Sequence, residues 1–286
     1  MLATIDPRTS VGPVTLTVRD VERMRDFYER VLGLDGLDEG EGRTVLGAGE
    51  RPLVELVEDR DAPPRPRGAT GLFHLALLVP DRAELARSLQ RLIETRWPLQ
   101  GASDHLVSEA LYVGDPEGNG IEIYRDRPRD EWQRDGGEMR MATLPLDLDD
   151  VLAELGSGEG TPGTLPPGTR MGHVHLNVAE LAASEAFYAG LLGLDVTARD
   201  YPGALFLSAG GYHHHIGLNT WRGEGAPPPP PDALGLRAYE LVVPDISTLE
   251  DTLTRLREGG AEVELADSSF AARDPSGNRL RLVVAD

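Results

Sequence analysis

The sequence predicts an α+β fold built from four βαβββ modules in tandem. Two internal repeats and a pair of matching tails lead to this prediction. The stretch "VTLTVRDVERMRDFYERVLGL" from Val14 returns 160 positions later as "VHLNVAELAASEAFYAGLLGL" from Val174. The stretch "HLALLVPDRAELARSLQRL" from His74 resembles "YELVVPDISTLEDTLTRL" from Tyr239, and "DPEGNGIEIY" resembles "DPSGNRLRLV". Because repeats of this length indicate a repeated structural unit, we name the four modules A, B, A′ and B′ in chain order.

Each module predicts the same elements in the same order. It opens with a short strand in which apolar residues alternate with others, and an acidic residue such as Asp20 or Asp81 then precedes a helix. The helix carries apolar residues at positions i, i+3 and i+4, which is typical of one buried face. Two or three short strands follow, separated by turns that contain glycine and proline.

The modules predict two glyoxalase-like domains joined by a linker. The first domain covers residues 8–127 with modules A and B, and the second covers residues 170–286 with modules A′ and B′. Residues 128–169 are rich in Arg, Asp, Gly and Pro, which predicts a linker with one short helical piece around Leu148 to Leu155. Residues 223–231 end in five prolines and predict an extended surface loop.

Composition and charge exclude several classes of function. The chain of 286 residues is 40% hydrophobic and 27% charged, as expected of a globular protein. Its net charge of -20 argues against nucleic acid and anionic membranes as partners. No apolar run approaches a membrane span, and no signal peptide follows Met1, so we expect a cytoplasmic protein. The oligomeric state stays open, with a homo-oligomer as one alternative.

The candidate metal ligands concentrate in the two middle modules. Because the chain has no cysteine, a metal must be bound by His, Asp or Glu. Aligned first strands place His74 of module B opposite His173 of module A′, whereas module A has Pro13 there and module B′ has Ala238. Aligned last strands place Glu122 opposite His215. A carboxylate such as Glu122, between two isoleucines on a strand, is costly to bury unless a cation is its partner.

Two imidazoles and one carboxylate form the facial triad that is used for Fe(II) and oxygen chemistry. We therefore predict a metal site of His74, Glu122 and His173. His175 is the rival for the last ligand, because strand alternation places it on the same face as His173. One cavity collects all of these residues only if module B faces module A′, so we expect that exchanged pairing.

The repeats, the helix ends "FYERVLGL" and "FYAGLLGL" and the "DPEGNGIEIY" tail resemble the vicinal oxygen chelate superfamily. This group includes glyoxalase I, bleomycin-resistance proteins and extradiol ring-cleaving dioxygenases. The resemblance covers both halves of the chain outside the linker. It implies that modules pair and that their mixed, curved sheets enclose a metal cavity.

Within that superfamily, "HLVSEALYVGDPEGNGIE" is similar to the extradiol dioxygenase signature, with a departure at Ser103. The two-domain bacterial catechol 2,3-dioxygenases are the most similar family. The resemblance implies that Glu122 is the carboxylate ligand, that Tyr112 and His105 act at the substrate oxygens, and that His215 is the acid–base histidine. The implied cofactor is Fe(II), with Mn(II) as the alternative, and the implied substrates are an aromatic diol and O2.

Two other classes of function stay open. A glyoxalase-type isomerase or lyase would use His215 as a fourth metal ligand and would need no oxygen. A non-catalytic small-molecule-binding protein, similar to drug-resistance proteins, would not need His74 and Glu122 together. For single residues the simpler alternatives are a sheet aromatic for Tyr112, a surface loop histidine for His105, and a solvated turn for the histidines in "GGYHHHIGLNTW".

Overall fold

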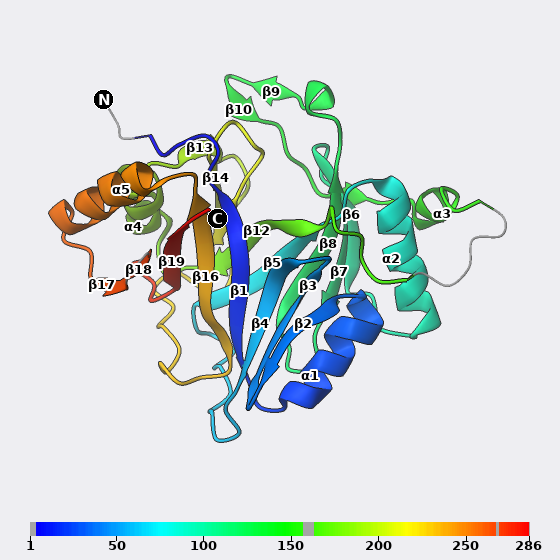
Figure 1. Cartoon of the computed structure of the whole chain (residues 1–286). Helices are drawn as coiled ribbons and strands as arrows, with labels where there is room; N and C mark the ends of the chain where they lie inside the picture. The colour runs from blue at the N-terminus through cyan, green and yellow to red at the C-terminus, as the bar shows by residue number, and fades with distance from the viewer. Residues whose placement is uncertain (1–3, 157–162, 267–268, 286) are drawn as a thin grey trace. The chain divides into compact units, whose positions relative to one another are not determined.

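The structure, a computed structural model, describes residues 4–156, 163–266 and 269–285. Four βαβββ modules follow one another along the chain (Figure 1), which confirms the predicted α+β fold. Module A consists of β1 (Ser10–Val18), α1 (Val21–Phe27), β2 (Asp35–Gly40), β3 (Arg43–Ala48) and β4 (Arg51–Glu58). Module B consists of β5 (Gly71–Leu78), α2 (Arg82–Glu94), β6 (Gly101–Asp104), β7 (Ser108–Gly114) and β8 (Gly120–Asp126).

The second half of the chain repeats this order. Module A′ consists of β12 (Arg170–Asn177), α4 (Leu181–Glu185), β13 (Asp195–Ala198), β14 (Ala204–Ser208) and β15 (Ile216–Asn219). Module B′ consists of β16 (Gly235–Val243), α5 (Ile246–Glu258), β17 (Val263–Ala266), β18 (Ser269–Arg273) and β19 (Arg279–Val284). In modules A and A′ the helix continues as a π-helical turn, Tyr28–Leu32 and Ala186–Leu191.

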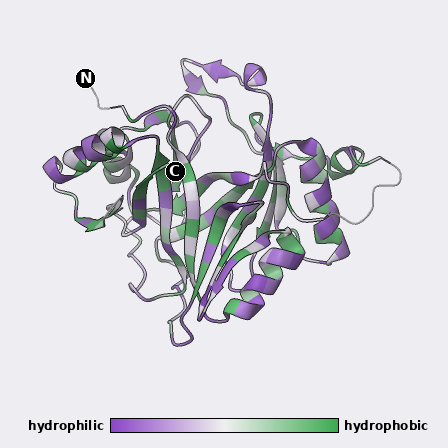
Figure 2. Cartoon of the chain, viewed as in Figure 1, coloured by the Kyte–Doolittle hydropathy of each residue, from purple (hydrophilic) through white to green (hydrophobic). Residues whose placement is uncertain are grey.

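Aspartates cap the first turn of three of the module helices, as the sequence predicts. The side chains of Asp20, Asp81 and Asp245 each accept a hydrogen bond from the backbone N–H three residues later. These bonds satisfy donors that the first turn of a helix leaves open. In Figure 2 the visible faces of α1 and α2 are largely hydrophilic, and their buried residues, such as Met24 and Leu85, pack inward.

The chain divides into two compact units. One contains residues 17–61 and 74–172, and therefore holds most of modules A and B; the other contains residues 1–16, 62–73 and 173–286. In the first, β8 pairs in parallel with β5 and antiparallel with β7, so the sheet is mixed. In the second, β15 pairs in parallel with β12 and antiparallel with β14. The domain boundaries at residues 127 and 170 stay a prediction.

The predicted linker contains short elements. They are β9 (Arg134–Asp135), β10 (Glu138–Met139), β11 (Leu144–Pro145) and α3 (Leu148–Leu152). Helix α3 is the helical piece that the sequence predicts, and residues 157–162 of the linker lie outside the described residues. Residues 223–231 form neither helix nor strand and are mostly exposed, as predicted for the proline-rich loop.

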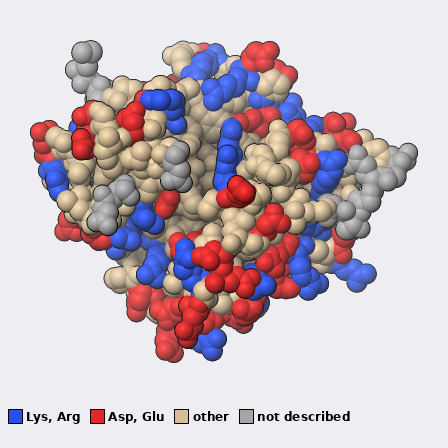
Figure 3. Space-filling view, in the orientation of Figure 1, with Lys and Arg blue, Asp and Glu red and all other residues tan. Residues whose placement is uncertain are grey.

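The surface carries charges of both signs. On the face in Figure 3 basic side chains are interspersed among acidic ones, and acidic side chains gather over the lower part of the view. No helix in the described part of the chain has both the length and the apolar character needed to cross a membrane.

In each unit a buried hydrogen bond between a tyrosine and an aspartate joins the two modules. In one unit the hydroxyl of Tyr28 donates to the carboxylate of Asp115 over 3.2 Å, and in the other Tyr188 donates to Asp274 over 3.0 Å. Both aspartates lie in the "DPxGN" turn and also accept from the side-chain amide of the turn asparagine. Burial raises the pKa of Asp115 to about 6, so this carboxylate depends on its hydrogen-bond donors.

Replacing Tyr28 by phenylalanine is expected to destabilise the protein by about 1–2 kcal/mol, because it removes one donor from a buried carboxylate. The free energy of unfolding in urea measures this effect. Tyr188→Phe should destabilise at least as much, because it removes the donor to Asp274 and also the partner of the buried Tyr239 hydroxyl, which lies 2.8 Å from that of Tyr188. An unchanged stability of Tyr28→Phe would contradict the role of this contact.

Candidate metal centre

Strands β5 and β8 bring two of the predicted ligands together. Their parallel register pairs His74 with Gly120 and Ala76 with Glu122, so both side chains project on one face of the sheet. The Nε2 atom of His74 lies 2.9 Å from Oε2 of Glu122. The two residues are 6% and 3% exposed. A carboxylate that is so deeply buried needs a cationic or hydrogen-bonding partner, and His74 is one.

Strand β7 adds Tyr112 to the same face. Its antiparallel register with β8 pairs Tyr112 directly with Glu122. The ring centroids of His74 and Tyr112 lie 5.7 Å apart. Tyr112 is thus more than a sheet aromatic, since its position on the strand places it beside both candidate ligands.

His105 meets Tyr112 from the turn between β6 and β7. Its Nε2 atom lies 2.6 Å from the hydroxyl oxygen of Tyr112, and its Nδ1 atom lies 2.6 Å from the carbonyl oxygen of Ala142. A carbonyl can only accept, so Nδ1 carries the proton. In the neutral ring Nε2 is then an acceptor, and the Tyr112 hydroxyl donates to it. His105 is therefore not a solvated surface histidine.

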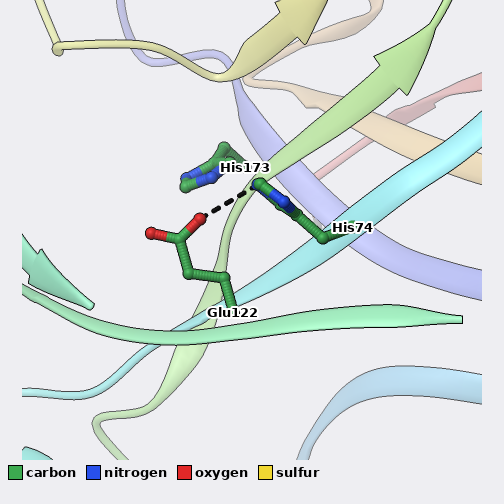
Figure 4. Close-up of side chains that lie close together, drawn as sticks. All are labelled: His74, Glu122 and His173. Atoms are coloured by element: carbon green, nitrogen blue, oxygen red, sulfur yellow. Dashed lines mark ion pairs between the residues drawn. The ribbon is translucent and has the colours of Figure 1, made fainter. Parts of the chain in front are cut away.

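His173 completes the group. It follows Gly172, which packs so closely on Tyr124 of β8 that an added Cβ atom would lie 1.8 Å from the tyrosine hydroxyl. A larger residue at position 172 would therefore collide with the Tyr124 side chain. His74, Glu122 and His173 each offer one ligand atom, and these atoms all lie within 4.8 Å of one another (Figure 4). The pairing of module B with module A′ stays a prediction.

His175 has different surroundings. Its ring lies against Gly217, where a Cβ atom would approach to 2.9 Å, and it contacts Phe73, Phe206 and Trp221 at centroid distances of 5.1–5.8 Å. Among the described residues, the group with metal-ligand spacing contains His173 and not His175.

The strand register corrects one alignment made from the sequence. His74 pairs with Gly120, and Val174 pairs with Ile216, so the position equivalent to Glu122 in module A′ is Gly217 rather than His215. His213, His214 and His215 do not lie on a strand, because β15 begins only at Ile216 and the histidines belong to the preceding turn.

This turn places its three histidines differently. The ring of His214 lies 4.1 Å from the ring of His173, whereas His215 stacks on Tyr212 at 4.9 Å. Nδ1 of His215 accepts the N–H of Ala209 over 3.1 Å. His213 is fully buried, with its Nδ1 atom 2.8 Å from that of His214. The ring of His213 also lies 6.3 Å from that of His173, so His214, which the sequence did not single out, has the nearer ring of the two.

A family model matches most of the chain. The model of the Glyoxalase/Bleomycin resistance protein/Dioxygenase superfamily matches residues 10–123 and 170–282, which are the four modules without the linker. The chain belongs to this superfamily. Membership confirms the predicted relationship and the glyoxalase-type fold of four βαβββ modules with mixed, curved sheets.

Within the superfamily the chain is similar to two dioxygenases. It is 44% identical over 289 residues to "Catechol-2,3-dioxygenase" of Bacillus subtilis, covering 99% of this chain and 100% of the relative. It is 30% identical over 159 residues to "Biphenyl-2,3-diol 1,2-dioxygenase 2" of Rhodococcus globerulus, covering 52% of this chain and 82% of the relative. The crystal structure of glyoxalase I from Zea mays shares the fold, with a TM-score of 0.59, 16% identity and coverage of 96% and 92%.

The donor set of this superfamily member fits a divalent transition metal. Two imidazole nitrogens and one carboxylate oxygen, without thiolate, suit iron or manganese. All three residues are buried, with His173 only 2% exposed, so bulk water does not solvate Glu122. A single metal at this group is the arrangement that the geometry supports.

Proposed function

We propose that this chain is a metal-dependent extradiol ring-cleaving dioxygenase that acts on a catechol-type aromatic diol with O2. The observation that carries the proposal is the pair Tyr112–His105 beside the buried group of His74, Glu122 and His173. Full-length identity of 44% to a catechol-2,3-dioxygenase supports it independently.

His74, Glu122 and His173 are proposed to hold Fe(II), with Mn(II) as the alternative. When bound, the metal supplies the open positions at which a diol and O2 react side by side. Because the three residues are buried, little water screens the attraction between the carboxylate of Glu122 and the cation. A carboxylate and two neutral imidazoles leave a net positive charge there, which favours an ionised diol.

Tyr112 and His105 are proposed to act at the substrate oxygens. Because the carbonyl of Ala142 keeps the proton of His105 on Nδ1, Nε2 is able to accept a proton through the Tyr112 hydroxyl. A protonated His105 would then donate from both ring nitrogens, and the Tyr112 hydroxyl would be free to donate to a developing oxyanion. The pair thus both takes and returns one proton.

The acid–base role predicted for His215 stays a prediction, and His214 competes with it. We expect His214→Ala to lower ring-cleavage turnover on the order of a hundredfold or more, because its ring contacts that of His173. His215→Ala is the matched control and should lower turnover less, because the Nδ1 atom of His215 is engaged by the Ala209 N–H. Both variants are assayed for metal content and catechol-dependent oxygen uptake.

The outcomes of this pair of variants separate the functions. Retained metal with lost turnover in either variant supports a dioxygenase with an acid–base histidine in this turn. A larger loss in His215→Ala would reverse the assignment. Lost metal in His215→Ala would instead favour the isomerase, in which this histidine is a fourth ligand.

Oxygen uptake tests the proposed function directly. The protein is loaded anaerobically with Fe(II) or, separately, Mn(II), and catechol and air-saturated buffer are then added. We expect one O2 consumed per catechol, together with the absorbance of a ring-opened product. Binding of catechol without oxygen uptake under either metal would favour a non-catalytic binding protein.

A further inference from the structure

The turn that carries His105 contains a residue with a strained backbone conformation. Residues 105–107 connect β6 to β7, and the N–H of His105 donates to the carbonyl of Ser108 over 2.8 Å. Leu106 has φ +69°, in the left-handed region that a branched side chain rarely adopts. Such a conformation is strained and persists only where neighbouring groups hold it.

Asp104 is the neighbour that holds this backbone. One of its carboxylate oxygens accepts the N–H of Leu106 over 2.8 Å, closing an aspartate turn around His105. The other oxygen accepts from the guanidinium of Arg127 over 2.7 Å. Asp104 thereby links the backbone beside His105 to Arg127, the residue that follows β8.

Arg127 is fixed in turn by a buried carboxylate. Its guanidinium also lies 3.1 Å from Glu109, and its backbone N–H donates to Val107 over 2.8 Å. Glu109 is 2% exposed and binds Arg82 and Arg125 as well, at 2.9 and 2.7 Å. A buried carboxylate with three guanidinium partners is held in one place, because losing any bond leaves charge without compensation.

We propose that Asp104 is a positioning residue for His105, a role that rests on the proposed function of the site. Its carboxylate holds Leu106 in the left-handed conformation that brings Nε2 of His105 within 2.6 Å of the Tyr112 hydroxyl. Without it the turn relaxes, and a displacement of about 1 Å at His105 is enough to interrupt proton transfer to Tyr112. The carboxylate of Asp104 bonds to Leu106 and Arg127, so it acts on Tyr112 through His105.

Two substitutions at one position test this role. Asp104→Ala should lower kcat for catechol-dependent oxygen uptake about tenfold to a hundredfold, with metal content and KM for catechol unchanged. Asp104→Asn keeps the oxygen that accepts the Leu106 N–H, so it should recover kcat to within a few-fold of the wild type. Asp135→Ala, an exposed aspartate on β9, is the control and should match the wild type.

A second readout needs neither metal nor substrate. Hydrogen exchange of the Leu106 amide in the metal-free protein should be faster in Asp104→Ala and close to wild type in Asp104→Asn. If the wild type shows no oxygen uptake, the proposed function fails, and amide exchange alone decides the positioning role. If the wild type is active and Asp104→Ala matches it, or if both variants lose the metal, the positioning role is overturned.

Discussion

Replacing Glu122 by alanine is expected to abolish metal binding and, with it, ring cleavage. The side chain is the only carboxylate in the candidate ligand group of the described residues, and its Oε2 atom lies 2.9 Å from His74. Its loss leaves two neutral imidazoles, whose affinity for a divalent cation is far lower than that of the triad. Metal analysis after anaerobic loading with Fe(II) measures the effect, and the wild type should bind near one ion per chain.

Two further variants make this result specific. His74→Ala should also lose the metal, because it removes a second ligand of the same ion. Glu131→Ala is the matched control, since this glutamate is exposed and lies in the segment after β8. A stoichiometry of two ions per chain, or full metal content in both Glu122→Ala and His74→Ala, would contradict a single site at this group.

Replacing His105 by alanine is expected to lower turnover by roughly a hundredfold to ten-thousandfold while the metal is retained. His105 is not among the grouped ligands, so metal content should not depend on it. Its removal leaves the Tyr112 hydroxyl without the acceptor at 2.6 Å, and no group returns the proton during ring cleavage. The measurement is single-turnover oxygen consumption by protein loaded with a known amount of metal.

Tyr112→Phe separates the two members of this pair. It keeps the ring beside His74 and removes only the hydroxyl, so the loss should be about a hundredfold or less and metal content should stay unchanged. Wild-type turnover in both His105→Ala and Tyr112→Phe would show that the pair is structural, and the proposed proton path would be wrong.

Most of the fold could be predicted because the modules repeat in sequence. Asp20, Asp81 and Asp245 recur at the helix starts and act there as caps, so local chemistry and repeat agree. The grouping of His74 with His173 could be proposed because the equivalent positions hold Pro13 and Ala238, which cannot bind a metal. Glu122 could be added because a strand carboxylate between isoleucines needs a partner.

The remainder of the site depends on geometry that no sequence pattern encodes. The histidines before β15 lie in a turn, so they do not follow the two-residue alternation of a strand. An alignment of the last strands on their turn glycines therefore matches His215 to Glu122, whereas the strand register matches Gly217, two positions later. The bond between the His105 ring and the carbonyl of Ala142 joins residues 37 apart, and its acceptor is a backbone atom, so the identity of residue 142 gives no sign of it. The left-handed Leu106 is equally hidden, because glycine or asparagine is the usual signal for that conformation.

Ring cleavage under ¹⁸O2 tests the central claim most directly. Protein loaded anaerobically with metal is mixed with catechol and ¹⁸O2, and the product is analysed by mass spectrometry with its carbonyl groups trapped against exchange with water. The claim predicts a ring-opened product that contains both atoms of one ¹⁸O2 molecule, and no such product from Glu122→Ala. Catechol that is bound but recovered unchanged, or a product without heavy oxygen, would contradict it.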